Sequence, residues 1–373
     1  MSARPWEEQE DWESPFANAH SAQIYRNRPH MDYETDGDFW RILRENAPER
    51  EYRSREEIVK TVCHWGQRKL LMSEIEFFTL IGPNRLRNAL VVYAGAASGK
   101  HIVYLSALFP SVRFVLIDPS AFARSVRACP RVRIINDLMT DDLARELSRE
   151  SDNLYFISDI RSDDPNTSTR EENERCIRED MDAQARWHGI LGSKRSMLKF
   201  RLPWADGQTR YLNGDIYLPV WGPQSTTEAR LITTDVAGAE RYRLYDNRKY
   251  ERQMFYFNNF TRHSLYRHGV ASTDASVEGL DHCYDCKAEI EILRRYLTEV
   301  NPRMVRADGV EATIARMIVD ISWSLDARRH LRDGNPNSEE RYQQLHRRRT
   351  GLAGEFFGAG AFDRCLCAEC VSH

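Results

Sequence analysis

Short apolar segments alternate with segments of helical periodicity along the middle of this chain of 373 residues. Alternation of this kind is typical of a parallel sheet whose crossover helices cover both faces. We therefore predict an α/β fold with a doubly wound, mostly parallel sheet and helices on both faces. The predicted strands are residues 90–93, 114–117, 132–135, 154–158, 197–202 and 229–234, and the predicted helices between them are residues 99–109, 141–147 and 171–191.

The segments on either side of this pattern differ from it. A helical pattern precedes the first strand at residues 55–81, and helical spacing returns at residues 282–350, so we expect a helical C-terminal extension. Residues 1–35 are polar without a sustained period, which predicts an N-terminal arm. Residues 326–373 form an Arg-rich, Cys-containing tail, which leaves residues 36–325 as the folded domain.

The composition is that of a folded protein without a membrane-spanning segment. Hydrophobic residues make up 41% of the chain and charged residues 29%, and no apolar run reaches the ~20 residues that cross a bilayer. The start of the chain is polar and acidic, unlike a signal peptide or a basic transit peptide. Eight cysteines without dense spacing favour a reducing, intracellular location, cytoplasmic with the nucleus left open. A net charge of −3 neither supports nor excludes RNA binding.

A turn with two glycines follows the first predicted strand. Gly95 and Gly99 join this strand to a helix, and small residues there let a ligand approach the backbone and the open helix N-terminus. Asp118 ends the next strand, where a carboxylate can bind the ribose hydroxyls of an adenosine. The alternative is a tight turn with a local capping Asp. The turn lacks a third Gly, and His101 follows Lys100 where a phosphate-binding loop has Ser or Thr, so adenosylmethionine is favoured over NAD or ATP.

Four ionisable residues lie within or beside the predicted elements: Lys69, Asp159, Lys199 and Glu228. Charged side chains in apolar surroundings are costly unless they are paired. A lysine held among carboxylates and a second cation can become a neutral amine that takes a proton from a hydroxyl. The alternative is that the four residues are scattered surface charges. The spacing of the four residues in the sequence, taken alone, favours this alternative.

Longer motifs carry a family resemblance. The stretches are GQRKLLMSEIEFF, VVYAGAASGKHIVYL, FVLID, FISDIRS, SMLKFRLPW, STTEARLI and YERQMFYFN, and they cover roughly residues 30–325. In this order they resemble the poxvirus-type cap-specific mRNA (nucleoside-2′-O-)-methyltransferases, which are also the regulatory subunits of poly(A) polymerase. The resemblance implies a Rossmann-like methyltransferase fold and S-adenosylmethionine as cofactor. It also implies methylation of the ribose 2′-hydroxyl of the first transcribed nucleotide of capped RNA.

The same resemblance assigns roles to individual residues. The four ionisable residues match the family's Lys-Asp-Lys-Glu tetrad, with Lys199 as the base and the other three orienting it. The implied cofactor-binding residues are Gln67, Tyr93, Gly95, Gly99, Asp118 and, beside the adenine, Met139. The family continues the strand-end Asp with Gly-Arg, whereas this chain has Pro119 and Ser120.

Recognition of the cap is implied at a second group of residues. A methylated guanine is flat and cationic, so aromatic rings stack on it and carboxylates accept hydrogen bonds from its edge. The residues implied are Tyr33 and Trp204 as aromatics, Asp206 and Glu251 as acids, and Arg201 toward the phosphates. Alternation along a strand places Lys199 and Arg201 on one face. Ser225 stands where the family has Tyr, and the alternative for Trp204 is a half-buried loop anchor.

Two pairs of cysteines form a possible metal site. Cys283 and Cys286 are one pair, and Cys367 and Cys370 are the other. Two such pairs can hold a structural zinc ion, which here would attach the tail to the domain. The alternative is reduced, unligated thiols, and the resemblance implies no metal.

Three classes of function remain open. The first is the enzyme, with capped mRNA as substrate, a poly(A) polymerase catalytic subunit as possible partner and no membrane. The second is a non-catalytic, RNA-binding processivity subunit of a poly(A) polymerase, and one chain can combine both roles. The third is a methyltransferase of small molecules or a nicotinamide oxidoreductase, neither of which needs Trp204, Asp206 or Glu251.

Overall fold

The computed structural model describes residues 39–52, 66–162, 169–222, 226–234, 238–264, 266–270 and 283–325. Some residues singled out from the sequence lie outside these ranges: Tyr33, Ser225, Cys367 and Cys370. The same holds for residues 55–65 of the first predicted helix and for the proposed arm and tail, residues 1–35 and 326–373.

A seven-stranded sheet forms the centre of the molecule, with the order β3-β2-β1-β4-β5-β8-β7. Its strands are β1 (Leu90–Ala94), β2 (Arg113–Ile117), β3 (Val132–Ile135), β4 (Leu154–Ser158), β5 (Ser196–Phe200), β7 (Gly214–Tyr217) and β8 (Ala229–Thr233). The pairs β1–β2, β2–β3, β1–β4 and β4–β5 are parallel, and β8 runs antiparallel to both β5 and β7. The predicted doubly wound, mostly parallel sheet is therefore confirmed.

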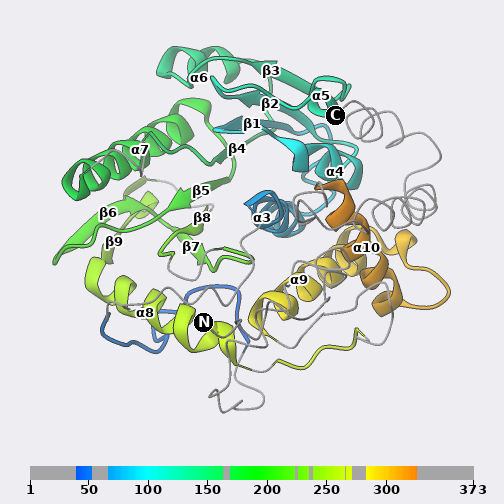
Figure 1. Ribbon diagram of the computed structural model, residues 1–373. Helices are drawn as coiled ribbons and strands as arrows, with labels where there is room; N and C mark the ends of the chain where they lie inside the picture. Colours follow the sequence, from blue (N-terminus) through cyan, green and yellow to red (C-terminus); the bar gives the residue numbers. More distant parts are fainter. Residues whose placement is uncertain are drawn as a thin grey trace, which may run out of the picture.

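Helices cover both faces of this sheet. The α-helices are α3 (Gly66–Ile81), α4 (Lys100–Leu108), α5 (Arg124–Arg127), α6 (Asp141–Leu147), α7 (Arg170–Leu191), α8 (Asn247–Asn259), α9 (Tyr284–Arg295) and α10 (Val310–Ser324). Figure 1 shows α6 and α7 on one side of the sheet and α3, α4 and α10 on the other. Thr169 begins α7 with a capping box closed by Glu172, and Gly192 ends it in a left-handed conformation.

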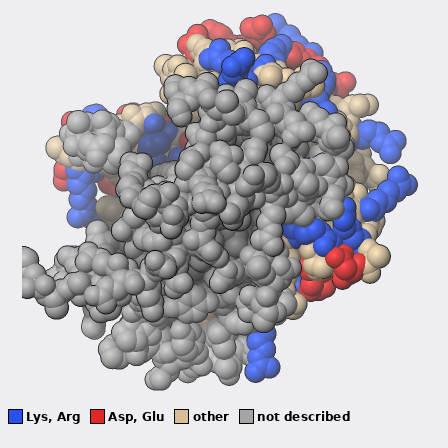
Figure 2. All heavy atoms as spheres, turned by 45° about the vertical axis from the view of Figure 1, so that its right-hand side comes forward, with Lys and Arg blue, Asp and Glu red and all other residues tan. Residues whose placement is uncertain are grey.

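The described surface mixes both signs of charge. Lys and Arg lie beside Asp and Glu over the described parts of the face in Figure 2, in keeping with a net charge of only −3. No helix in the described part of the chain combines the length and the hydropathy that a membrane span requires.

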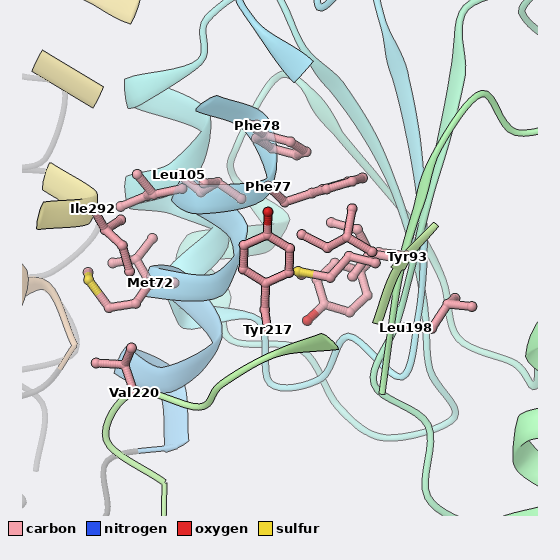
Figure 3. Close-up of a cluster of buried hydrophobic side chains, with 14 of the residues drawn as sticks. Met72, Phe77, Phe78, Tyr93, Leu105, Leu198, Tyr217, Val220 and Ile292 are labelled. Carbon is pink, nitrogen blue, oxygen red and sulfur yellow. The ribbon is translucent and has the colours of Figure 1, made fainter. Parts of the chain in front are cut away.

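Helix α3 lies between two layers and is buried on nearly all sides. In Figure 3 it has Ile292 of α9 on one side and Tyr93 and Leu198 of the sheet on the other. Its charged side chains are buried too, and each has a partner, as buried charges require. Arg68 lies 2.6 Å from Glu289, and Glu76 lies 2.8 Å from Arg41.

A second, two-stranded sheet was not predicted from the sequence. Strands β6 (Gln208–Leu212) and β9 (Tyr242–Asp246) pair antiparallel, and α8 follows β9 directly. The strand predicted at residues 197–202 was too long, since β5 ends at Phe200. Pro203 has no amide hydrogen to continue the ladder. Arg201 therefore lies just past the strand end, and its predicted place on the same face as Lys199 stays a prediction.

Candidate active site

The parallel arrangement of neighbouring strands brings several predicted residues to one edge of the sheet. Gly95, Asp118 and Asp159 directly follow β1, β2 and β4, which are neighbours in the sheet. The carboxyl ends of parallel strands form the usual ligand-binding edge of an open α/β sheet. The glycine turn, the strand-end Asp118 and the tetrad residue Asp159 therefore lie at the same edge of the sheet.

The four ionisable residues form one cluster at this edge. The Lys199 Nζ atom lies 3.1 Å from Asp159 Oδ1 and 3.9 Å from Glu228 Oε2, and it donates to the main-chain oxygen of Asp159 at 3.0 Å. Lys69 Nζ, from α3, lies 2.7 Å from Glu228 Oε1. The side chains are between 11% and 19% exposed, so the cluster is nearly dry but reachable. The alternative of scattered surface charges is wrong.

A fifth charged residue, Arg230, completes this cluster and was missed from the sequence. Arg230 Nη2 lies 2.6 Å from Asp159 Oδ1, and Nη1 lies 2.9 Å from Glu228 Oε1. Arg161 adds a longer contact of 3.8 Å to Glu228. The available signal was the spacing of Glu228 and Arg230, because side chains two apart near a strand share a face.

The electrostatics of the cluster favour ionised acids. Burial alone would raise the pKa of Asp159, but Lys199 and Arg230 outweigh it and lower that pKa. Burial likewise opposes ionisation of Glu228, and Lys69, Arg230 and Lys199 hold its pKa well below the usual value. Burial opposes the charge of Arg230, yet Asp159 and Glu228 raise its pKa. Three cations thus surround two carboxylates that stay charged.

The turn after β1 requires glycine at both predicted positions. Gly95 has a φ of +76°, and a Cβ there would lie 2.8 Å from the carbonyl carbon of Asp159. Gly99 has a φ of +73° and precedes α4. Only glycine takes such angles at low cost, and its missing side chain lets the turn pack against the backbone of Asp159. The turn and the acidic cluster are therefore in direct contact.

The end of β2 fits an adenosine ligand. Asp118 Oδ2 accepts from the Ala97 amide at 3.0 Å and Oδ1 accepts from the Ser120 amide at 2.8 Å. A carboxylate has about four lone-pair sites, so sites remain for two ribose hydroxyls. Leu138, 63% exposed, and Met139, 8% exposed, follow β3, the neighbouring strand, and offer apolar surface for a flat base. The residues present fit the adenosine part of S-adenosylmethionine.

Gln67 and Tyr93 lie deeper than the turn. Gln67 Oε1 is 2.8 Å from His101 Nδ1, at the start of α4, and His101 Nε2 is 2.9 Å from Glu74. Tyr93 is fully buried within β1, and burial together with Glu74 raises its pKa well above the ordinary value. In the described structure both side chains lie beside His101, which is at the start of the helix that follows the turn.

Trp204 stands on the surface near the cluster. Its ring is 40% exposed and stacks on the Arg201 guanidinium at 4.0 Å from the ring centroid. Arg201 is itself only 8% exposed and is held by Asn173, at 3.0 Å, and by Glu174 of α7. Arg170, the first residue of α7, lies 5.6 Å from the same ring centroid, so two guanidinium groups contact this half-exposed indole.

The two predicted acids of the cap site share one partner that the sequence did not reveal. Arg248 donates to Asp206 at 2.7 Å and to Glu251 at 2.8 Å. The Asp206 side chain is 86% exposed and that of Glu251 only 13%. The structure thus brings these acids together, as expected for two groups that meet one ligand edge.

The structure describes only one of the two cysteine pairs in the proposed zinc site. Cys283 and Cys286 lie at the start of α9 and are buried among apolar side chains. In the described ranges no group of three or more His, Cys, Asp or Glu side chains could hold a metal ion. Cys367 and Cys370 lie outside these ranges, so the zinc clasp stays a hypothesis.

The fold and the site together define an α/β protein of the Rossmann-like class, with a glycine turn, a strand-end Asp and a buried charge cluster at one edge of its sheet. The family described as Poly A polymerase regulatory subunit matches residues 39–301, and the chain belongs to this family. The resemblance to the poxvirus-type family, which was inferred from the motifs, is therefore confirmed.

Individual relatives agree with this family. Two proteins of myxoma virus, from strains Lausanne and Uriarra, carry the name cap-specific mRNA (nucleoside-2′-O-)-methyltransferase. Each is 27% identical over 222 residues, which cover 56% of this chain and 65% of the relative. The match thus spans slightly less than two thirds of these proteins. A solved structure of bluetongue virus VP4, described as a multifunctional RNA-capping production line, has a TM-score of 0.38 and 13% identity over 64% of this chain and 38% of that chain, too little to carry an argument.

Proposed function

We propose that this chain is a cap-specific mRNA 2′-O-methyltransferase. It would transfer the methyl group of S-adenosylmethionine to the ribose 2′-hydroxyl of the first transcribed nucleotide, which converts cap 0 to cap 1. The observation that carries the proposal is the position of Lys199 Nζ, 3.1 Å from Asp159 Oδ1, at the carboxyl end of the sheet and beside the glycine turn. This arrangement supports a proton acceptor beside the residues that fit adenosine.

Lys199 is the proposed base. Asp159 binds it through both a carboxylate oxygen and the main-chain oxygen, which fixes the position of the amine. Lys69 and Arg230 neutralise Glu228, so Lys199 keeps only a long contact of 3.9 Å to that acid. S-Adenosylmethionine, when bound, supplies an electrophilic methyl group.

Capped RNA is the proposed substrate because of the second group of residues. Trp204 is 40% exposed and would stack on the methylated guanine, while Asp206 and Glu251 offer acceptors for its edge. Tyr250, next to Glu251, packs its ring 5.5 Å from that of Phe200, the residue after Lys199. This contact connects the cap group to the charge cluster through two adjacent elements.

The second candidate function is a non-catalytic, RNA-binding subunit of a poly(A) polymerase. The family description supports it, since it names a regulatory subunit of that enzyme. The charge cluster favours catalysis, because a protein that only binds RNA does not need two carboxylates and three cations in a nearly dry site. Both roles can occur in one chain.

A transfer assay tests the proposal. Labelled S-adenosylmethionine is incubated with the protein and with short RNAs that are capped, capped without the guanine methyl group, or uncapped. We expect label on the first ribose of capped RNA, and none with Lys199→Ala. Lys287→Ala is the matched control, because Lys287 is also paired, at 2.7 Å from Glu291, but lies on α9.

The outcomes separate the two candidates. Transfer by the wild type and the control, with loss of transfer in a folded Lys199→Ala protein, supports the enzyme. Retained turnover in Lys199→Ala removes this residue as the base. Tight RNA binding without transfer to any of the RNAs supports the non-catalytic subunit.

A further inference from the structure

A cavity of about 770 Å³ lies at the opposite end of the sheet from the charge cluster. Asn153 precedes β4, Lys194 precedes β5, and Thr234 follows the reversed strand β8, so these lining residues share one edge of the sheet. Asp159 marks the other edge, one strand length of about 15 Å away. The cavity is therefore a separate site.

The lining of this cavity is positively charged. Arg85, Lys194, Arg195 and Arg241 contribute cations, and none of the lining residues is acidic. Lys194 Nζ donates to Asn153 Oδ1, at 2.9 Å, which is a neutral partner. With an amide oxygen as the partner of Lys194 and no acidic side chain among the lining residues, the field in the cavity attracts anions.

Arg241 carries the argument furthest. Its Nε atom is buried and has no hydrogen-bond partner within the described structure. Gly189 makes room for this guanidinium, since a Cβ there would lie 2.9 Å from Arg241 Nη2. A charged group that is short of acceptors is costly, and Arg241 lines the cavity, so an anion bound there would lower this cost.

Helix dipoles explain only part of this arrangement. Helices α3 and α7 both end here, at Ile81 and Leu191, and their carbonyl ends attract cations. Such attraction acts at solvent-exposed helix ends and does not need a hollow. It does not account for a hollow of this size around Arg241. A volume of about 770 Å³ is within the usual range for a small-molecule pocket.

The neutral part of the lining completes the site. His188 Nδ1 lies 2.7 Å from the hydroxyls of both Ser193 and Ser196. Burial, with Arg241 as the second cause, lowers the pKa of His188 to about 4, so the ring is uncharged at neutral pH. The amide of Asn84 adds donors and an acceptor that can meet a base or a sugar, while the amide of Asn153 is engaged by the main chain and by Lys194.

We propose that this cavity binds a nucleoside phosphate, with Arg241 and Lys194 contacting the phosphate group. Guanidinium and ammonium groups are the usual partners of phosphate, and Arg offers two parallel donors. The nucleoside phosphate is either a free nucleotide or one unit of an RNA strand, and both share this chemistry. The site is distinct from the proposed transfer site and does not depend on it.

Direct binding tests the proposal with two probes, uridine 5′-monophosphate and uncapped pentauridylate. Titration calorimetry at low salt would compare the full-length wild type with Arg241→Gln and with Lys194→Gln. Arg145→Gln is the matched control, because Arg145 is an exposed arginine paired with Asp142 on α6. We expect about a tenfold weaker affinity in each cavity variant and a salt slope smaller by about one.

The binding titrations distinguish a free nucleotide from an RNA strand and can overturn the proposal. Loss of monophosphate binding in the cavity variants identifies a site for free nucleotides, and loss for pentauridylate alone identifies a site for an RNA strand. Equal binding by the wild type, Lys194→Gln and the control overturns the proposal, as does the absence of wild-type binding to both probes. Lys194 is exposed, so its variant stays informative if Arg241→Gln does not fold. Methyl transfer should be unchanged in Lys194→Gln, so failure of the proposed enzyme function would be seen separately.

Discussion

The guanidinium of Arg230 lies 2.6 Å from Asp159 Oδ1, closer than Lys199 Nζ, which lies 3.1 Å from the same oxygen. An arginine keeps its charge at every physiological pH. The ion pair between Arg230 and Asp159 therefore persists at every physiological pH, and Lys199 contacts the same carboxylate oxygen as Arg230. This relationship makes Arg230 a positioning residue of the proposed site.

Replacing Arg230 should change the pH dependence of methyl transfer. Arg230→Lys keeps the charge but not both contacts, and we expect a folded protein with slower transfer. Arg230→Gln removes a cation that lowers the pKa of Asp159, so the acid limb of the pH–rate profile should move to higher pH. Removing one partner of a buried pair also costs about 3–5 kcal/mol of unfolding free energy.

Single-turnover rates between pH 6 and pH 10, with urea unfolding of the same proteins, measure both effects. Arg243→Gln is the control, because Arg243 forms an exposed pair with Glu45, at 2.6 Å, far from the cluster in the chain. An unshifted profile in a folded Arg230→Gln protein would contradict the role assigned to Arg230.

Gly95→Ala should destabilise the protein more than Gly192→Ala does. Both glycines have positive φ angles, +76° and +58°. A Cβ at Gly192 meets nothing within 4 Å, so only backbone strain of about 1 kcal/mol is expected there. A Cβ at Gly95 would lie 2.8 Å from the backbone of Asp159 and Ile160, so the chain must shift. Unfolding by urea compares the two, and equal losses of free energy would show that the contact with Asp159 does not matter.

Trp204→Ala should weaken binding of capped RNA with little effect on stability. The ring is 40% exposed, so few core contacts are lost. Loss of one stacking surface is worth about 1–3 kcal/mol, which is roughly a 5- to 150-fold weaker affinity. Fluorescence titration with methylated and unmethylated cap dinucleotides measures the change. Leu244→Ala, at another exposed apolar residue, is the control, and an unchanged preference for the methylated cap in Trp204→Ala would exclude the stacking role.

His188 should make the protein less stable in acid. Its pKa is lowered to about 4 in the folded protein, mainly by burial, against about 6.5 in the unfolded chain. Between these values the unfolded state binds more protons, so the free energy of unfolding falls as the pH falls from about 6.5 to 4. The full loss is about 3 kcal/mol.

Urea unfolding at pH 7.5, 5.5 and 4 measures this effect against His188→Gln. The variant loses the bonds to Ser193 and Ser196 at every pH, but its free energy should fall less steeply in acid than that of the wild type. Parallel curves for the two proteins would show that His188 does not titrate in this window.

Most of the central sheet could be predicted because most of its strands are largely buried, whereas β3 is only partly buried and β7 was not predicted. Every residue of β1 and β4 is buried, which produces short apolar runs that are easily recognised. Strands β6 and β9 lie partly on the surface, and their mixed sequences QTRYL and YRLYD carry no such run. Helix α8 was missed for a related reason, since only one face of it is buried.

The site residues that could be predicted are those that lie in the family motifs. Lys69, Asp159, Lys199 and Glu228 were named from the family motifs, and spacing alone favoured scattered charges. Arg230 was missed although its partner Glu228 lies only two residues away. Its contact with Asp159, 71 residues away, and the contact of Arg248 with Asp206, 42 residues away, leave no local pattern in the sequence. Contacts over such separations depend on the folded topology, which periodicity does not encode.

A single peptide segment connects the glycine turn with the proposed base. The Asp159 amide donates to the Ala94 oxygen at 2.9 Å, and the Asp159 oxygen accepts from Lys199 Nζ at 3.0 Å. A ligand that moves the turn by a few tenths of an ångström would therefore move the amine as well. Occupancy of one substrate site should then alter affinity at the other, and by thermodynamic reciprocity the two effects must be equal.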